Sequence, residues 1–368
     1  MNQPLQKILI VLIAGIGDFV LASKAIRSIR RGYPYAQIHL LTSSDAALLA
    51  QNYIYVDRVW AFPIREMKKS KWVLVDVLKM INRLRKNRFA VVINLYKVES
   101  RLGAVKMGLL FYLLGAEEKI GHDRFGFGCF LTRRIDADVF LNRHMADVMG
   151  EIALQGGGIG DNEKTEIFWS RHVEELWNDW IRLVSKNRPL IGINPGGDSE
   201  LKRWNPDRFS SVAERLIDNW GANIVLLGGP SDVRITRRIA DNMRIKPINL
   251  AGKLTLNDLA YLISRFRLLI TNDSGPMHIA AATGTPVVAI FGPSDPNMFH
   301  PYMSSDRYRV IRSAVPCCPC EKSVCDTMKC LDLVTPDEVY EVAAELLHHF
   351  DQITAEPGGR IKRSSMFP

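Results

Sequence analysis

The sequence contains no apolar run close to the ~20 residues that a membrane-spanning helix needs. The longest candidates, residues 8–17 and 107–116, suit a buried strand or a short core helix better. The first run also lacks an A-x-A cleavage site and leads into a glycine turn and an amphipathic helix, which argues against a signal peptide. We therefore expect a cytoplasmic protein.

The composition also lacks any strong bias. Hydrophobic residues make up 47% and charged residues 24% of the 368 residues, which excludes wholesale disorder, a collagen-like repeat and a coiled coil. The net charge of +9 is uneven: residues 1–170 hold 24 Lys/Arg against 16 Asp/Glu, and residues 171–368 hold 24 against 23. A partner that carries phosphates or carboxylates is expected to meet the first half.

Cysteine is scarce, and five of the six cysteines lie within a short late segment. There is no second C-x-x-C and no nearby histidine, so the pattern leaves zinc or iron–sulfur ligation, reduced structural thiols and disulfides open. A cytoplasmic protein favours thiols or metal ligands over disulfides. The segment contains Cys317, Cys318, Cys320, Cys325 and Cys330.

Strands and helices alternate along the chain, which is typical of a doubly wound α/β sheet, and the pattern restarts near residue 189. In the first half we expect strands at 7–13, 36–41 and 89–95 and a helix at 19–31. In the second half we expect strands at 189–194, 223–228, 268–271 and 287–291, with helices at 209–219 and 233–242 and another from 277. The predicted organisation is a domain over 1–170, a linker over 171–188, a domain over 189–350 and a mobile basic tail over 351–368.

Residues 65–88 carry nine Lys/Arg and two acids, with apolar residues at helical spacing. This pattern predicts a basic amphipathic helix. It either packs on the core with its basic face in solvent or forms a surface attracted to anionic lipid. The apolar stripe consists of Leu74, Val77, Leu78, Ile81 and Leu84.

A glycine turn with Gly15 and Gly17 follows the first predicted strand and leads to Asp18. Glycines let backbone N–H groups approach a ligand, and a helix N-terminus favours an anion. A nicotinamide site would need a third glycine where Val20 stands and an acid after the second strand, so we disfavour it. Asp18 either faces a ligand at the carboxyl edge of the sheet or caps the helix.

A second motif, Asn-Asp-Ser-Gly-Pro-Met-His, follows the strand at 268–271. Asp273 or Ser274 can cap the next helix, whose free N–H groups would face a bound phosphate. The Asp273 carboxylate could instead bind ribose hydroxyls. With Gly275 and Pro276 beside it, His278 is a candidate contact for a diphosphate.

Two further glycine-rich turns follow strands. The first contains Gly197 and Asp198 and precedes Lys202, which is either a point charge for a phosphate or a solvated surface lysine. The second ends at Asp232, which either binds sugar or ribose hydroxyls or caps the next helix.

Together these motifs resemble glycosyltransferase family 9, the heptosyltransferases, most strongly over 15–30, 194–209, 227–232 and 271–296. The resemblance implies the GT-B fold, in which two Rossmann-like domains face each other across a cleft. It implies a nucleotide-sugar donor on the C-terminal domain and an acceptor on the N-terminal domain. The usual members transfer heptose from ADP-heptose to the lipopolysaccharide inner core at the cytoplasmic face of the inner membrane, without a cofactor.

Carried over by residue, the resemblance makes Asp18 the general base in an inverting displacement. Lys202 and the N–H groups of 274–278 would neutralise the diphosphate without a metal ion. Asp273 would bind donor hydroxyls, and Asp232 the nucleoside ribose. Such an enzyme acts on an anionic glycolipid, has no nucleic-acid partner and can contact the membrane peripherally.

Gly15 and Gly17 would lie on the acceptor side. Gly197 and Asp198 stand where other members have hydroxyl residues near the phosphate, a departure that concerns the identity of the donor. Acceptor specificity is expected in the basic loops 58–71 and 121–134. Two alternatives remain: a nucleotide-sugar 2-epimerase of the same fold and a degenerate carbohydrate-binding protein.

Overall fold

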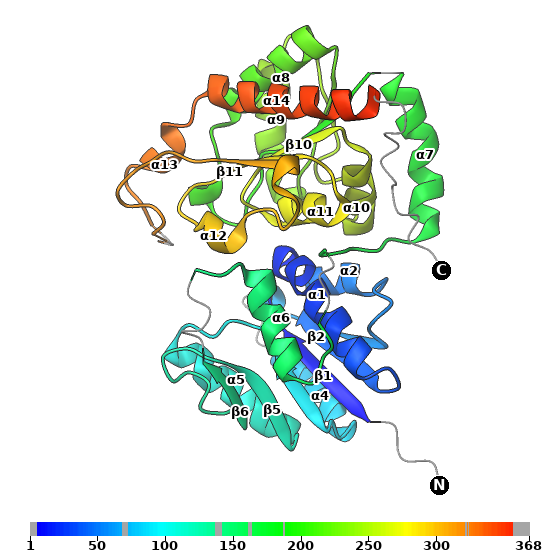
Figure 1. Cartoon of the computed structure of the whole chain (residues 1–368), viewed down its shortest axis with the longest axis vertical. Helices are drawn as coiled ribbons and strands as arrows, with labels where there is room; N and C mark the ends of the chain where they lie inside the picture. The colour runs from blue at the N-terminus through cyan, green and yellow to red at the C-terminus, as the bar shows by residue number, and fades with distance from the viewer. Residues whose placement is uncertain are drawn as a thin grey trace. The chain divides into compact units, whose positions relative to one another are not determined.

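The computed structural model describes residues 6–67, 73–136, 142–160, 164–186, 188–320, 322 and 324–355. The chain divides into two compact units, Met1–Glu166 and Ile167–Pro368. Each unit is built on a six-stranded parallel sheet (Figure 1). The α/β class with two Rossmann-like halves, expected from the alternating pattern, is confirmed.

The first sheet has the strand order β3-β2-β1-β4-β5-β6. Its central strand β1 is a run of β-branched and leucine residues that is buried on both faces, as a parallel strand covered by helices requires. The strands are β1 (Lys7–Leu12), β2 (Gln37–Ser43), β3 (Arg58–Phe62), β4 (Val91–Asn94), β5 (Glu118–Asp123) and β6 (Arg133–Asp136).

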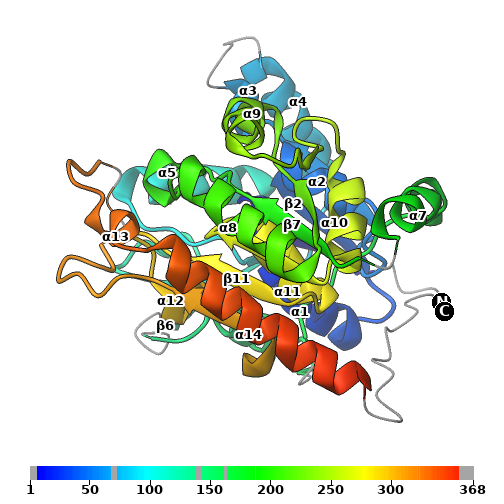
Figure 2. The ribbon, with the colours of Figure 1, turned by 90° about the horizontal axis from the view of Figure 1, so that it is seen from above.

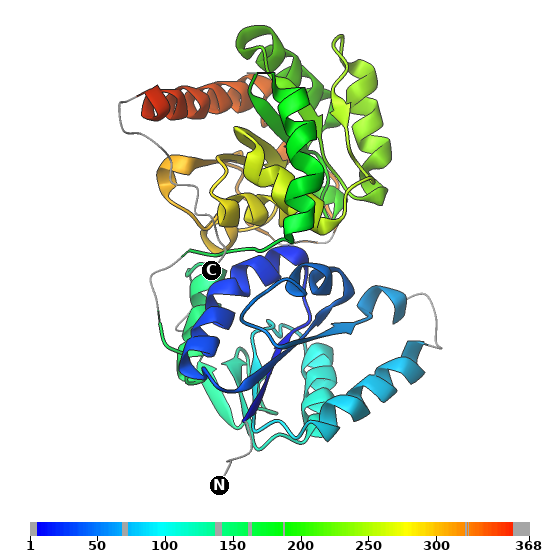
Figure 3. The same cartoon turned by 90° about the vertical axis from the view of Figure 1, so that its right-hand side faces the viewer.

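Helices cover both faces of this sheet. The connections from β3 to β4 and from β4 to β5 cross in the same direction, so right-handed crossovers place the helices α4 and α5 on one face. The helices α1 and α6 pack against each other, and α1 is the long blue helix in Figure 3. The helices are α1 (Ile16–Gly32), α2 (Ser44–Ala50), α3 (Ile64–Met67), α4 (Val73–Lys86), α5 (Arg101–Leu114) and α6 (Met145–Gln155).

The second sheet repeats this topology in the order β12-β11-β10-β7-β8-β9. Its strands are β7 (Leu190–Asn194), β8 (Asn223–Leu226), β9 (Ile248–Asn249), β10 (Leu268–Asn272), β11 (Val287–Ile290) and β12 (Tyr308–Ile311). The α-helices are α7 (Arg171–Ser185), α8 (Pro206–Trp220), α9 (Val233–Asn242), α10 (Leu256–Arg265), α11 (Gly275–Thr283), α12 (Pro296–Phe299), α13 (Lys329–Asp332) and α14 (Pro336–Ala355). The described part of this unit also contains the 3₁₀ turns η2 (Glu200–Lys202), η3 (Pro230–Asp232) and η4 (Ser305–Arg307).

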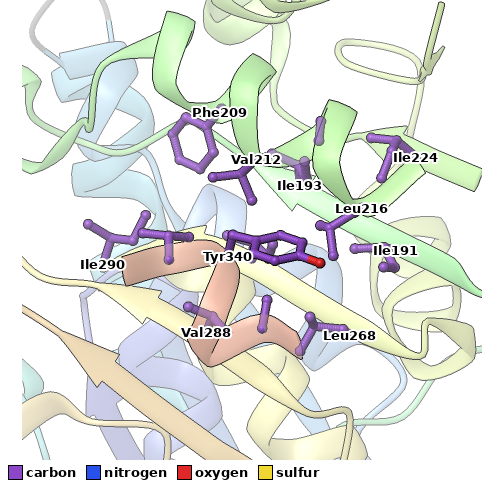
Figure 4. Close-up of a cluster of buried hydrophobic side chains, with 14 of the residues drawn as sticks. Ile191, Ile193, Phe209, Val212, Leu216, Ile224, Leu268, Val288, Ile290 and Tyr340 are labelled. Atoms are coloured by element: carbon purple, nitrogen blue, oxygen red, sulfur yellow. The ribbon is translucent and has the colours of Figure 1, made fainter. Parts of the chain in front are cut away.

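One core of the second unit lies between the sheet and the helices α8 and α14, which run side by side (Figure 2). Aliphatic side chains of β7, β10 and β11 meet Phe209, Val212 and Leu216 of α8 and Tyr340 of α14 (Figure 4). These helices therefore fix one face of the sheet whose carboxyl edge carries the predicted donor motifs.

The segments expected as linker and tail differ in part from the prediction. Where we expected a linker, α7 forms an amphipathic helix, and the Trp177 indole donates a 2.8 Å hydrogen bond to Asp258 Oδ1 of α10. Burying this apolar face stabilises the helix. At the other end α14 continues to Ala355, so helix replaces the first five residues of the expected tail. Residues 356–368 lie outside the described residues.

The basic amphipathic helix is present as α4. Val77 and Leu84 are buried, whereas Leu74 and Leu78 of the same predicted stripe are exposed. Packing on the core therefore accounts for only part of the stripe. Within the described part of the chain, no helix has the length and apolar character to cross a membrane.

Candidate active site

Both sheets have a topological switch point, where strands on either side are reached by crossovers in opposite directions. It lies between β1 and β4 in the first unit and between β7 and β10 in the second. Open α/β sheets bind ligands outside the carboxyl ends of the strands at this point. The predicted site residues after β1, β7 and β10 therefore stand where each fold places a ligand.

Asp18 lies in the first turn of α1, after β1. We expected Gly17 in a turn before the helix, but α1 begins at Ile16, and Gly17 is already helical because Gly15 is the N-cap. The Asp18 carboxylate makes one half of a capping box, since its Oδ2 accepts a 3.1 Å hydrogen bond from the Gly15 N–H, and Gly15 has no side chain to return the bond. Asp18 is therefore not the N-cap residue that the capping alternative predicted: it lies at the third position of the helix and binds the N–H of the actual N-cap, Gly15.

The structure adds residues at this edge that the sequence did not suggest. Tyr96 follows β4, and burial, with the charges of Asp18 and Glu99, raises the pKa of its hydroxyl. The Glu99 Oε1 pairs with Lys97 Nζ at 2.5 Å and with an Arg124 nitrogen at 3.0 Å. Asp18 is therefore next to a mixed cationic and phenolic surface. Arg124 lies in one of the two loops that were expected to contact the acceptor. The polar residues directly after β4 were not predicted, although their position at the end of a strand could have indicated a site.

His122, at the carboxyl end of β5, belongs to the same edge. Burial lowers the pKa of its imidazole, and the Tyr96 backbone is its hydrogen-bond partner. A neutral imidazole near neutral pH can serve as donor or acceptor toward a hydroxyl.

In the second unit, buried side chains tie two loops together. The Asn194 amide donates 3.1 Å hydrogen bonds to Ser274 Oγ and to Thr271 Oγ1. The Asn272 amide donates to the Pro195 carbonyl at 2.8 Å, and its Oδ1 accepts from the Trp204 N–H at 3.1 Å. Fully bonded buried networks of this kind hold loops rigidly.

Lys202 and Asp273 meet across these loops. Lys202 Nζ lies 2.9 Å from Asp273 Oδ2; the aspartate side chain is 6% exposed and the lysine side chain 28%. The two groups form an ion pair, but the geometry at Asp273 Oδ2 is not that of a hydrogen bond. Asp198 lies farther out, with its Oδ1 4.0 Å from the same Nζ. Lys202 is therefore held in the site rather than solvated at the surface.

The N-terminus of α11 lies beside this pair. We expected an Asp273 or Ser274 side chain to cap the helix; Ser274 occupies the N-cap position, but its side chain makes no cap hydrogen bond. Its hydroxyl instead donates to the Asn272 carbonyl at 3.1 Å. Gly275 and Pro276 open the helix, and the His278 side chain is buried in its first turn. The positive end of the helix dipole thus carries no side-chain cap.

Asp232 is built into the glycine-rich turns. Its Oδ2 accepts a 2.9 Å hydrogen bond from the Gly229 N–H at the start of η3. Asp232 also occupies the N-cap position of α9, but its side chain makes no cap hydrogen bond to that helix, so the predicted side-chain cap is not formed. The Asp232 Oδ1 is 3.6 Å from Arg203, which also donates to the Gly197 carbonyl at 2.7 Å. A Cβ on Gly196 would stand 2.5 Å from Asp232 Oδ2, so only glycine fits there, whereas a Cβ on Gly197 would meet nothing closer than 3.5 Å.

All six cysteines are free thiols, so the disulfide alternative is not realised in this structure. Burial, with a hydrogen bond to Cys330, raises the pKa of Cys318 to about 12. Within the described ranges, no three potential ligand side chains are grouped as a metal site. The five clustered thiols line one cavity together with Leu201, the residue that precedes Lys202 in the sequence.

The sequence of the chain matches a known protein family. The model of glycosyltransferase family 9 (heptosyltransferase) matches residues 77–331. The chain is 29% identical over 296 residues to lipopolysaccharide heptosyltransferase 3 of Escherichia coli K12, covering 78% of this chain and 82% of that protein.

Two solved structures have the same fold, which confirms the GT-B architecture. A family 9 glycosyltransferase from Veillonella parvula superposes with a TM-score of 0.76 at 24% identity, over 94% of this chain and 97% of that one. The Escherichia coli ADP-heptose lipopolysaccharide heptosyltransferase II gives 0.72 at 23% identity, over 94% and 100%. With more than half of its length matched by the family model, the chain belongs to glycosyltransferase family 9, the heptosyltransferase family.

Proposed function

We propose that the protein is an inverting glycosyltransferase that transfers heptose from ADP-heptose to the core of lipopolysaccharide or a related glycan. The observation that carries the proposal is the Lys202–Asp273 pair at the switch point of the second sheet, beside the start of α11. The relatives named for heptose transfer to lipopolysaccharide support the choice of sugar and acceptor.

The second unit would hold the donor. As the sugar–phosphate bond breaks, negative charge develops on the nucleoside diphosphate and must be stabilised. The Lys202 ammonium and the N–H groups at the start of α11 supply positive charge there without a metal ion. The buried Asp273 holds the ammonium in place and offers carboxylate oxygens to donor hydroxyls, and Asp232 contacts the ribose.

The first unit would hold the acceptor. Asp18 takes the proton from the acceptor hydroxyl as that oxygen attacks the anomeric carbon, and the single displacement inverts the centre. The α1 dipole favours the ionised carboxylate. Lys97 and Arg124 at the same sheet edge suit an acceptor rich in phosphate and acidic sugar. Such an acceptor places the enzyme at the cytoplasmic face of the inner membrane.

A nucleotide titration tests the donor half. Purified protein is titrated by calorimetry with ADP, UDP, GDP and CDP, each with and without EDTA. We expect selective binding of ADP that EDTA does not change. Lys202→Met should weaken ADP binding at least tenfold, because a cation–phosphate interaction contributes about 1.5–3 kcal/mol. Lys246→Met is the matched control, because this ammonium donates hydrogen bonds to the Ala240 and Asp241 carbonyls of α9.

The outcomes separate the alternatives. Preference for UDP or GDP rejects heptose as the sugar, and equal ADP affinity of both lysine variants removes Lys202 from the donor site. Turnover of nucleotide sugar without any acceptor favours the 2-epimerase alternative. Nucleotide binding without transfer to purified core acceptors favours the carbohydrate-binding protein.

A further inference from the structure

Arg203 makes contacts in the second unit that the proposed transfer does not yet use. Its guanidinium donates two hydrogen bonds to the Gly197 carbonyl, from Nε at 3.1 Å and from a terminal nitrogen at 2.7 Å. The same group lies 3.6 Å from Asp232 Oδ1. The backbone of Arg203 is fixed as well, because its N–H donates to the Glu200 carbonyl at 3.0 Å. The side chain therefore holds one peptide group of the glycine-rich turn that follows β7.

The N–H of this peptide group points away from the arginine. In a planar trans peptide, the C=O and the N–H of the next residue point in opposite directions. With the Gly197 carbonyl on the guanidinium, the Asp198 N–H faces the other side of the turn. Within the part of the chain that the structure describes, the backbone N–H groups of Gly196, Gly197 and Asp198 donate no hydrogen bond to a protein atom. Successive N–H groups of this kind form anion-binding sites.

Lys202 lies beside the same turn. A Cβ built on Gly197 would stand 3.7 Å from the Lys202 Cβ. The Lys202 ammonium pairs with Asp273, whereas the guanidinium of the next residue, Arg203, bonds the turn. The two consecutive basic residues thus have different partners, although both end at the loop that carries the N–H groups.

We propose that Arg203 is a positioning residue for the donor diphosphate, because it holds the N–H groups of 196–198 next to the Lys202 ammonium. Gly197 and Asp198 stand where hydroxyl residues were expected near the phosphate, so backbone N–H groups take over as phosphate donors in this chain. The planar fork of an arginine fixes a carbonyl with two bonds, which a single ammonium cannot do. This inference rests on the proposed donor site and concerns the phosphates, not the base or the sugar.

Calorimetry of the full chain with ADP, adenosine and inorganic pyrophosphate separates the two halves of the nucleotide. Arg203→Met removes the fork, and Arg203→Lys keeps the positive charge. The matched control is Arg208→Met, an α8 arginine that also donates to main-chain carbonyls, those of Asp332 at 2.7 Å and Val334 at 2.6 Å. Lys202→Met reports on the donor site itself. Thermal unfolding identifies any variant that does not fold, and Arg203→Lys carries the test if Arg203→Met does not.

We expect Arg203→Met to weaken the binding of ADP and pyrophosphate by at least about tenfold, and the binding of adenosine by less than about twofold, because only the phosphates contact the turn. Arg203→Lys should weaken ADP binding by at least about fivefold, since it keeps the charge without the fork. Arg208→Met should match the wild type with all three probes.

Three results would overturn the inference. ADP affinity that stays at the wild-type level in Arg203→Met removes the arginine from the donor site. Equal losses for adenosine and pyrophosphate assign Arg203 to the folding of the unit. Wild-type affinity in Arg203→Lys assigns the effect to charge alone. In each case, weak ADP binding by Lys202→Met leaves the proposed donor site standing, whereas absence of ADP binding by the wild-type chain overturns both proposals.

Discussion

Replacing Asp18 by two different residues separates its capping contact from its proposed role as general base. Asp18→Asn keeps a carbonyl oxygen that can accept the hydrogen bond from the Gly15 N–H, which spans 3.1 Å in the structure. Asp18→Ala removes that acceptor. Neither variant can take a proton from an acceptor hydroxyl, so both should lose catalysis. Only Asp18→Ala also loses the hydrogen bond to the Gly15 N–H.

The two effects have different sizes. Losing the cap costs about 1 kcal/mol, and losing a negative charge near the helix N-terminus costs a further 0.3–1 kcal/mol, roughly. Asp18→Asn should therefore lower the free energy of unfolding by less than about 1 kcal/mol, and Asp18→Ala by about 1–2 kcal/mol. Loss of a general base lowers kcat by about 10² to 10⁴, or about 3–5 kcal/mol in the barrier. The expected increase in the activation barrier is therefore larger than the loss of stability that removal of the capping contact can cause.

The assay is transfer from ADP-heptose to purified core acceptor at saturating substrate, with thermal unfolding and ADP titration on the same preparations. We expect both variants to lose at least 99% of kcat while ADP affinity stays within about twofold. A kcat for Asp18→Asn within tenfold of wild type would refute the reasoning and leave the carboxylate as a helix cap alone. A rate loss in Asp18→Ala only would assign the effect to the cap.

Three further predictions follow from contacts in the structure. Gly196→Ala should destabilise the second unit by about 1–3 kcal/mol through overpacking, because its Cβ would stand 2.5 Å from an aspartate oxygen, whereas Gly197→Ala should be near neutral in thermal unfolding. Burial lowers the pKa of His39 to about 4 in the folded protein, below its ordinary value of 6.5. The unfolded chain therefore binds a proton first, and the free energy of unfolding should fall as the pH drops from about 6.5 toward 4. In chemical denaturation, His39→Gln should reduce this dependence of the free energy of unfolding on pH. At pH 8, iodoacetamide should modify Cys325, whose thiol pKa is lowered by backbone N–H groups, at least tenfold faster than Cys318, as followed by peptide mass spectrometry.

Each of these has a contrary result. Equal unfolding midpoints for the two glycine variants would show that the loop relaxes freely. An unchanged pH profile in the His39 variant would assign the acid sensitivity to other groups. Equal modification rates at the two cysteines would show that the cluster opens in solution.

Much of the fold could be predicted from local pattern. Apolar runs rich in β-branched residues predicted seven of the parallel strands, because strands buried on both faces must be continuously apolar. Five strands, β3, β5, β6, β9 and β12, were not predicted. The sequences of β5 and β6 are rich in charged residues, and β9 has only two residues, so none of the three forms an apolar run. The helix α7 was taken for a linker because its apolar face is narrow and packs through Trp177 onto a helix far along the chain.

The candidate site divides in the same way. The aspartates and Lys202 were found because each follows a strand, where a parallel sheet presents its ligands. Tyr96 and Lys97 were not found, since neither a motif nor a periodicity marks them, whereas Arg124 lies in the loop 121–134 that was expected to contact the acceptor. Ser274 was assigned a cap that it does not make, because its hydroxyl is engaged in a network with Asn194 that exists only in the folded unit.

The sequence alone determined the α/β class and the two-fold repetition, because these follow from the local alternation of apolar runs and amphipathic stretches. Only the tertiary structure decided that β7 lies beside β10, and so that Lys202 meets a buried Asp273. It also decided which side of α5 faces the core and which side stays exposed. Strand order and burial are set by how distant segments pack, and a helix that is apolar on both sides does not reveal in its own sequence which side is covered.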